Sequence, residues 1–294
     1  MIVIDPESTP RKDLHQFLLG AVAPRPIAFA STIDEEGNPN IAPYSFFNAF
    51  SSNPPVVVFS SNIRGSDQGV KDTLHNVEAT GEVVINAVSF SIVRQMAVAS
   101  IQFPKGVSEF EKSGLTPIPS DLVRPFRVKE SPVQMECKVK DIIRLGEHGG
   151  AGNLIICDVL RIHINPNVVD ERGRINPHKI DLMGRLGRAY YVRASGEAIH
   201  TIVQSVETIS IGYGQLPESV RNSKILTGNN IGQLAGLAHV PEEEDILAMK
   251  KEPKIREILE SNNPLEGLHH YAQRELLKEN LELAARIVWL GAYL

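Results

Sequence analysis

Residues 41–61 read Ile-Ala-Pro-Tyr-Ser-Phe-Phe-Asn-Ala-Phe-Ser-Ser-Asn-Pro-Pro-Val-Val-Val-Phe-Ser-Ser, a polar and aromatic run followed by an apolar strand. Pro54 and Pro55 stop any helix and force an extended backbone. Val56–Phe59 then has the β-branched and aromatic composition of a packed strand. Hydroxyls, amides and backbone N–H groups at its end suit a planar, polar-edged ligand with a phosphate tail. The same residues also fit a plain strand, loop and strand of an all-β core, so both interpretations stay open.

Two neighbouring blocks favour the first interpretation. Residues 23–40 read Ala-Pro-Arg-Pro-Ile-Ala-Phe-Ala-Ser-Thr-Ile-Asp-Glu-Glu-Gly-Asn-Pro-Asn, and residues 71–86 read Lys-Asp-Thr-Leu-His-Asn-Val-Glu-Ala-Thr-Gly-Glu-Val-Val-Ile-Asn. In order and spacing, the three blocks resemble the flavin reductase-like family, whose fold is an FMN-binding split barrel. The resemblance covers residues 20–195, and the residues after about 200 resemble no family in the same way.

Composition describes an ordinary globular chain of 294 residues, with 42% hydrophobic residues and a net charge of −5. This balance predicts neither a basic nucleic-acid surface nor a polybasic membrane patch. No uninterrupted apolar run approaches the roughly 18 residues that span a bilayer, and the first residues do not have the pattern of a secretion signal. The two cysteines, Cys137 and Cys157, fall in apolar strand patterns, where a reduced, buried thiol is usual. We therefore expect a cytoplasmic protein without membrane or nucleic-acid partners.

The pattern along the first 199 residues predicts a β-rich α+β domain, a split β-barrel with inserted helices. A helix is expected at 10–19, 71–79 and 91–99, and a strand at 27–33, 39–45, 56–59, 82–87, 133–145 and 153–164. A long, proline-rich connection spans 103–126, with a helical turn near 109–112. The glycine-rich loop 146–152 lacks the Lys-Ser/Thr of a P-loop, so we interpret it as a hairpin loop.

The character of the sequence changes near residue 200. Helices are expected at 229–238, 241–251, 253–261 and 264–290, several of them beginning at a proline. We therefore expect a second, ordered helical region at 200–294, and we hypothesise that it covers the first domain or its dimer partner and restricts access to the flavin ring.

The residues around the start of the helix at 71–79 can supply a phosphate site. A phosphate needs positive charge and hydrogen-bond donors, and helix N-termini favour anions. The candidates are Ser60, Ser61, Arg64, Lys71, Asp72 and Thr73. The alternative is that Asp72 is a plain helix cap and that Arg64 and Lys71 are solvated; the family resemblance places the phosphate here.

The ring of the flavin needs an apolar face and hydrogen bonds to its pyrimidine edge. The candidates are Ser45, Phe46, Phe47 and Asn48. Because side chains alternate along a strand, at most one of the two phenylalanines faces the same side as Ser45. The alternative is that Phe46 or Phe47 is simply a core residue. Family members often carry a glycine–aromatic segment near the flavin; Tyr190 and Tyr191 match it loosely, since Arg188 stands where a second glycine is expected. A surface tyrosine pair is an equally good interpretation.

No catalytic acid, base or metal site can be assigned from spacing. His269 and His270 are adjacent in a predicted helix, where side chains diverge by about 100°, which makes them poor joint ligands. This fits flavin chemistry, in which the cofactor carries the hydride or the electrons. The resemblance implies a homodimer with FMN near its interface, acting as an NAD(P)H-dependent flavin reductase that serves a partner monooxygenase or a small acceptor. The alternatives are a flavoredoxin-like electron carrier and a flavin-binding protein without turnover.

Overall fold

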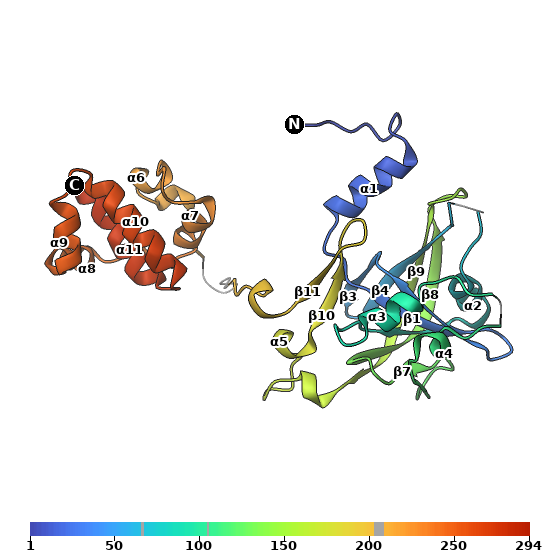
Figure 1. Cartoon of the computed structure of the whole chain (residues 1–294). Coiled ribbons are helices and arrows are strands. Elements are labelled where there is room, and N and C mark those ends of the chain that lie inside the picture. The colour runs from blue at the N-terminus through green and yellow to red at the C-terminus, as the bar shows by residue number, and fades with distance from the viewer. Residues whose placement is uncertain (66–67, 105, 203–208) are drawn as a thin grey trace. The chain divides into compact units, whose positions relative to one another are not determined.

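The computed structural model describes residues 1–65, 68–104, 106–202 and 209–294 (Figure 1). Contacts within the chain divide it into two compact units, Met1–His200 and Thr201–Leu294. Within the described residues, no helix is long and apolar enough to cross a membrane.

A seven-stranded antiparallel sheet forms the first unit, in the order β2-β1-β5-β8-β9-β4-β3. Its strands are β1 (Ala28–Ile33), β2 (Pro39–Tyr44), β3 (Phe47–Ser52), β4 (Pro55–Asn62), β5 (Glu82–Asn86), β8 (Val133–Arg144) and β9 (Gly152–Ile164). The strands β8 and β9 are the longest and join the two halves of the sheet. The β-rich fold expected from the sequence is therefore confirmed.

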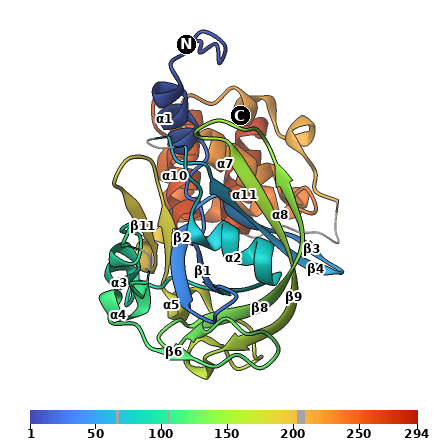
Figure 2. The same cartoon turned by 90° about the vertical axis from the view of Figure 1, so that its right-hand side faces the viewer.

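Helices and short elements are inserted between the strands. They are α1 (Arg11–Ala21), α2 (Asp72–Thr80), α3 (Val93–Val98), α4 (Glu109–Ser113), β6 (Pro117–Ile118), β7 (Arg127–Val128), α5 (Pro177–Ile180), β10 (Leu182–Arg185) and β11 (Tyr191–Ala194). Figure 2 shows α2 lying across β1, where Leu74 and Val77 enter the core. The helix ends at Gly81, whose φ of +68° is a conformation that favours glycine.

The stretch 41–61 holds one strand more than its pattern predicts. Residues 46–52 were expected to be a connection, but Phe47–Ser52 is β3, an edge strand that pairs with β4. Since its side chains from Asn48 onward are exposed, the strand carries no buried alternation that a sequence pattern could reveal. The following strand is also longer than expected, because it includes Ser60 and Ser61.

Both cysteines are buried and unpaired, as expected. Cys137 on β8 and Cys157 on β9 are fully buried in one core cluster. Burial raises the pKa of the Cys137 thiol to about 12, and it raises that of Cys157 as well. Neither thiol is therefore a reactive group at neutral pH.

The second unit is helical and has its own apolar core. Its helices are α6 (Glu218–Arg221), α7 (Gly228–Ala235), α8 (Glu243–Ala248), α9 (Pro253–Leu259), α10 (Pro264–Leu277) and α11 (Leu281–Leu290). The fully buried Leu234, Ile255 and Leu268 are part of one cluster that joins these helices. The single helix expected at 264–290 is wrong, because Glu279 has a φ of +64° and divides it into two.

Candidate functional site

The first turn of α2 begins at Lys71, which occupies the N-cap position without a side-chain capping bond. Asp72 is therefore the first helical residue and not the cap, so the capping alternative is wrong. Its side chain is exposed, and its carboxylate suits the positive end of the helix dipole. Thr73 is fully buried instead, and its hydroxyl accepts a hydrogen bond from Asn40 Nδ2 at 2.9 Å.

This hydrogen bond belongs to a polar cluster that fixes α2 to the sheet. Asn40 Nδ2 also donates to the Thr32 hydroxyl at 3.0 Å, and Asn76 Nδ2 donates to the same oxygen at 3.0 Å. Buried polar groups are stable only when they are hydrogen-bonded, so the cluster holds β1, β2 and α2 in one arrangement. Thr73 thus has an anchoring role, and its contact with a phosphate stays a prediction.

Lys71 lies in an electrostatically unusual place. Its Nζ is 4.8 Å from the centroid of the Tyr44 ring, a cation–π distance. Burial lowers the pKa of Lys71, and the charge of the Arg64 guanidinium lowers it further. The two cations predicted to bind phosphate therefore lie close enough to repel one another, an arrangement that an anion between them would relieve.

Two buried hydroxyls lie beside these cations. Burial raises the pKa of Tyr44 to about 12, an effect that the nearby hydroxyls of Thr73 and Ser61 oppose. Within the described part of the chain, however, neither Tyr44 Oη nor Ser61 Oγ has a partner at hydrogen-bond geometry. Unpaired buried hydroxyls are uncommon, and they add donors to the charges of Arg64 and Lys71.

The end of β4 adjoins the predicted ring residues. The backbone N–H of Ser60 donates to the carbonyl of Phe46 at 2.8 Å, and its hydroxyl donates to Asn62 Oδ1 at 2.8 Å. Gly152 on β9 makes room for this hydroxyl, because a Cβ there would lie 2.7 Å from Ser60 Oγ. The phosphate candidates and the ring candidates are thus brought to adjoining segments.

Of the two phenylalanines, Phe47 packs against a buried core cluster, whereas the Phe46 ring lies near the His15 ring and the Arg25 guanidinium. The prediction that at most one of them shares the face of Ser45 is consistent with this packing. Asn48 is exposed, and its Oδ1 accepts from the backbone N–H of Ala49 at 2.8 Å, which leaves its amide nitrogen as a donor. Ser45, Phe46 and Asn48 are the ring candidates whose side chains are not committed to the core.

Arg25 is a site residue that the sequence did not indicate. Its side chain is only 4% exposed, and the guanidinium donates to the carbonyls of Leu19 (2.7 Å), Val22 (2.6 Å) and Leu186 (3.0 Å). Burial lowers its pKa, and the charge of Arg185 lowers it further.

The same guanidinium reaches the ring candidates. Its Nε is 3.4 Å from Ser45 Oγ, and its carbon is 5.8 Å from the centroid of Phe46. Arg25 therefore holds together the end of α1, the loop between β10 and β11, and the residues predicted to contact the ring. Its flanking prolines were the only signal in the sequence.

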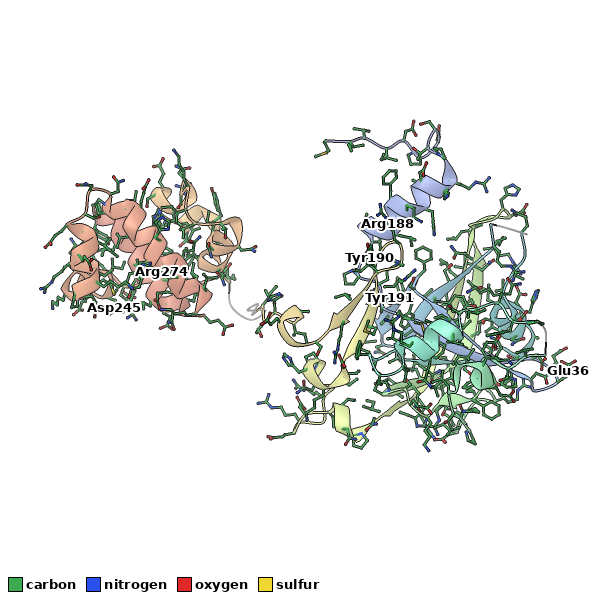
Figure 3. The ribbon with its side chains drawn as sticks, viewed as in Figure 1. Glu36, Arg188, Tyr190, Tyr191, Asp245 and Arg274 are labelled. Carbon is green, nitrogen blue, oxygen red and sulfur yellow. The ribbon has the colours of Figure 1, made fainter. Side chains whose placement is uncertain are left out.

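The tyrosine pair lies on the hairpin of β10 and β11 (Figure 3). Tyr190 is 65% exposed, while Tyr191 lies under the Arg185 guanidinium, 4.5 Å from its ring centroid. Arg188 adopts a φ of +54°, a value that favours glycine, at the position where the family pattern predicts one. Leu186 in the same loop accepts from Arg25, so the hairpin adjoins the ring candidates through one hydrogen bond.

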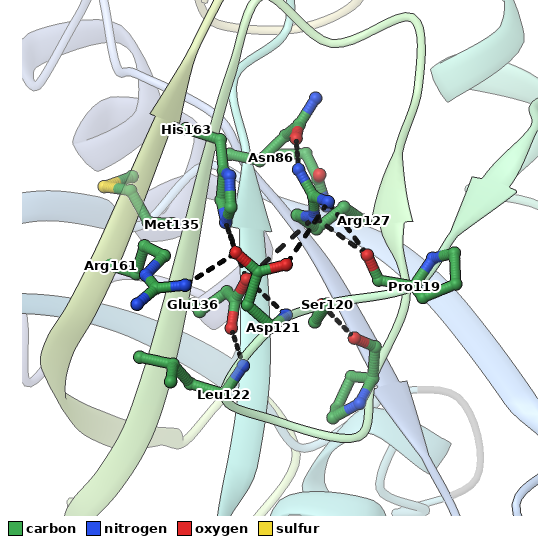
Figure 4. A network of polar contacts seen from close by, with 12 residues as sticks. Asn86, Pro119, Ser120, Asp121, Leu122, Arg127, Met135, Glu136, Arg161 and His163 are labelled. Carbon is green, nitrogen blue, oxygen red and sulfur yellow. Dashed lines mark hydrogen bonds and ion pairs between the residues drawn. The ribbon is translucent and has the colours of Figure 1, made fainter.

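Among the described residues, one group of side chains of the metal-binding type lies elsewhere in the first unit. Atoms of Asp121, Glu136 and His163 come within 4.8 Å of one another (Figure 4). However, Glu136 already accepts from His163 Nε2 (2.6 Å) and from two backbone N–H groups, and Asp121 accepts from Arg161 (2.6 Å). Because these donors occupy the carboxylates, the group is an ion-pair network that ties the loop after β6 to β8 and β9.

The residues at the two adjoining segments fit an FMN. Arg64, Lys71 and the buried Ser61 hydroxyl match a phosphate, and Phe46 with the Asn48 amide matches an apolar face with a polar edge. Helix α2 points its N-terminus toward the same region, which adds N–H donors. The sequence missed the supporting residues Arg25 and Asn40.

Comparisons with known proteins show which family the chain resembles. The family model described as flavin reductase like domain matches residues 20–180. An uncharacterized protein of Aquifex aeolicus is 41% identical over 184 residues, which are 63% of this chain and 91% of that protein.

Two solved structures resemble the chain in fold as well as in sequence. Nitrilotriacetate monooxygenase component B from Bacillus cereus is 33% identical with a TM-score of 0.63, over 68% of this chain and 98% of that one. The 2-nitrobenzoate 2-nitroreductase NbaA of Pseudomonas fluorescens is 26% identical with a TM-score of 0.62, over 72% of this chain and 100% of that one.

Proposed function

The chain belongs to the flavin reductase-like family, and from this premise we propose that it is an FMN-binding, NAD(P)H-dependent flavin reductase. Flavin binding is supported by the family and by the fit of the site. The acceptance of a hydride from NAD(P)H is the further step of the proposal.

The observation that carries the proposal is the approach of Arg64 and Lys71 at the start of α2. The pKa of Lys71 is lowered first by burial and further by the charge of Arg64, so the two side chains lie close enough to interact. A phosphate between them would gain charge-assisted hydrogen bonds and would remove the repulsion between the two charges. Ser61, whose buried hydroxyl has no hydrogen-bond partner among the described residues, lies at the same end of the sheet.

FMN, when bound, supplies the redox chemistry, and the protein binds and orients it. Arg64 and Lys71 would hold the phosphate, while Phe46 would offer an apolar contact to the ring. Arg25 fixes Ser45 and Phe46 through its own contacts, so these residues need little rearrangement on binding. No side chain in this arrangement has to act as an acid or a base.

The acceptor is proposed from the relatives. Since one similar structure is a component of a monooxygenase, reduced flavin delivered to a partner monooxygenase is one outlet. Since another is a nitroreductase, a small organic acceptor is the second outlet.

We further propose that the protein is a homodimer. The outer part of β9 exposes Leu160, Ile162 and Ile164, and the edge strand β3 exposes Phe50 at 69%. Contiguous exposed apolar surface and an unpaired strand edge are typical of an interface. Light scattering should give twice the chain mass of 32.3 kDa, and Ile162→Lys should shift the protein toward the monomer. A single-chain mass for the wild type at micromolar concentration would contradict the dimer.

The function is tested by the absorbance spectrum of the purified protein and by NAD(P)H oxidation with and without added FMN. We expect flavin bands after incubation with FMN, and steady oxidation that depends on FMN. Bound FMN without oxidation would refute the reductase and indicate an electron carrier. Absence of flavin binding would refute both.

A further inference from the structure

A cavity of about 890 Å³ lies between α1 and two loops of the first unit. One wall is α1, with Arg11, Lys12 and His15, and the apolar Leu14 and Leu18 beside them. The other wall is formed by residues 62–65 together with Gln68 and the glycine-rich loop 146–151. The volume lies within the range of about 300–1,000 Å³ that is typical of small-molecule sites.

The loop wall is held rigidly by hydrogen bonds. The backbone N–H of Gly149 donates to Gln68 Oε1 at 2.6 Å, and that of Gly150 donates to the carbonyl of Ile63 at 2.8 Å. A Cβ on Gly149 would lie 2.8 Å from Gln68 Nε2 and 3.1 Å from the Arg64 carbonyl, so the two loops approach as closely as glycine permits. Arg11 Nη1 donates to the carbonyl of Gly149 at 3.1 Å and joins α1 to this wall.

The described side chains that line the cavity are more basic than acidic, a balance that suits an anion. Among the described residues that line it, Arg11, Lys12 and Arg64 are permanent cations, and Glu147 is the one carboxylate. His15 and His148 add two imidazoles, and Leu14, Leu18 and Ile63 supply an apolar surface. A phosphorylated ligand with a flat apolar part fits this combination better than a phosphate alone.

Arg64 lines the cavity and is also one of the two cations of the proposed FMN phosphate site. The cavity therefore adjoins the phosphate end of the flavin site. FMN ends at its phosphate, so only a ligand that continues beyond the flavin phosphate could reach into this cavity from the flavin site.

We propose that this cavity binds an adenosine diphosphate group, the half of a dinucleotide that lies beyond its redox-active ring. The inference rests on the proposed function, because FAD and NAD(P)H both carry this group and both belong to flavin reductase chemistry. Its diphosphate lies against Lys12, Arg11 and Arg64, and its adenine lies against the apolar side chains of α1.

The first test uses ADP alone, which needs no flavin. Calorimetric titration of the full-length protein should show ADP binding, and Lys12→Glu should weaken it about tenfold, since a reversed charge at a few ångströms repels the diphosphate. Lys12 is exposed, and no side-chain hydrogen bond of Lys12 occurs among the residues that the structure describes. The matched control is Lys112→Glu, which makes the same charge change at an exposed position on α4 and should leave ADP binding unchanged.

The second test identifies the source of the group. If the flavin supplies it, Lys12→Glu weakens FAD about tenfold and leaves the Kd of FMN unchanged. If the nicotinamide nucleotide supplies it, both flavins keep their affinity and the KM for NADH or NADPH rises instead. Either result supports the proposal.

The proposal is overturned if the wild type does not bind ADP, if both charge reversals weaken ADP equally, or if Lys12→Glu weakens FMN as much as FAD. FMN binding without ADP binding refutes the cavity assignment and leaves the proposed function standing. ADP binding without FMN binding supports the cavity assignment and refutes the proposed function.

Discussion

Replacing Lys71 by alanine should weaken FMN binding while leaving riboflavin binding nearly unchanged. Riboflavin lacks the phosphate, so only FMN depends on the Lys71 charge. A hydrogen bond to a charged group contributes about 1.5–3 kcal/mol, which corresponds to a loss of affinity of about 10- to 150-fold. The start of α2 and Arg64 remain, so some phosphate affinity persists.

The substitution also removes a contact that has nothing to do with FMN. Lys71 Nζ lies 4.8 Å from the Tyr44 ring centroid, and a cation–π contact contributes about 0.5–2 kcal/mol to stability. Thermal unfolding of the apoprotein therefore has to accompany the binding measurement. Lys71→Arg keeps the charge and should retain most of the affinity, and Lys129→Ala removes an exposed lysine after β7 as a matched control.

The assay is titration of the apoprotein with FMN and with riboflavin, followed by flavin fluorescence. An equal loss of affinity for both ligands would refute the phosphate assignment of Lys71, because it would mean that the substitution damaged the site as a whole. An unchanged FMN affinity would refute it as well.

Three further outcomes are expected. Because burial and Arg64 lower the pKa of Lys71, this amine loses its proton at a lower pH than a free lysine; FMN affinity should fall as the pH rises through that lowered value, whereas Lys71→Arg should show a flat profile over the same range. Burial alone would raise the pKa of Glu136, but the N–H groups of Asp121 and Leu122 and the contact with His163 lower it overall. The ionised carboxylate therefore stabilises the fold at pH values above the ordinary pKa of 4.5. This stability is lost as the pH falls through the lowered pKa. Glu136→Gln should thus cost about 1–3 kcal/mol in urea unfolding at pH 7 and progressively less in acid, and a pH-independent difference would contradict the charge argument. Removal of residues 201–294 should leave FMN affinity intact and should speed reoxidation by bulky acceptors more than by oxygen, if the second unit covers the flavin; equal rates for acceptors of every size would contradict that role.

Turn chemistry explains which elements could be predicted from the sequence. Gly37 adopts a φ of +89° in the hairpin between β1 and β2, and Gly81 adopts +68° after α2. Glycine stands at both positions in the sequence, and because other residues rarely adopt such φ values it marks a hairpin turn at Gly37 and a helix end at Gly81. The long pair β8 and β9 was also predicted, since its apolar residues recur over more than ten positions.

The missed elements lack such local signals. Strand β3 is exposed along almost its whole length, so its strand character comes from pairing with β4 and not from a buried face. The break between α10 and α11 has neither proline nor glycine. It is held by Glu275, whose carboxylate accepts from Lys278 Nζ and Asn280 Nδ2, both at 2.8 Å. The apolar residues on both sides keep a helical spacing, which hides the break.

The same contrast applies to the candidate site. Lys71 and Arg64 were predicted because a cation near a helix start has a local meaning. Arg25 and Asn40 were missed because their meaning depends on distant partners: Arg25 donates to Leu186, 161 residues away, and Asn40 donates to Thr73, 33 residues away. A single sequence does not show which distant carbonyl or hydroxyl a polar side chain will meet.

These two missed residues support different ends of the site. Asn40 fixes the start of α2, through Thr73, and with it the position of Lys71. Arg25 fixes Ser45 and Phe46 and anchors them to α1 and to the loop that holds Leu186. Asn40 and Arg25 bond to different partners, Thr73 and Thr32 for the one and Ser45, Leu19, Val22 and Leu186 for the other, so each supports its own end of the site. A change at Asn40 should therefore act on the affinity for the phosphate, and a change at Arg25 should act on the environment of the ring. Titrations with FMN and with riboflavin, which lacks the phosphate, distinguish these two effects.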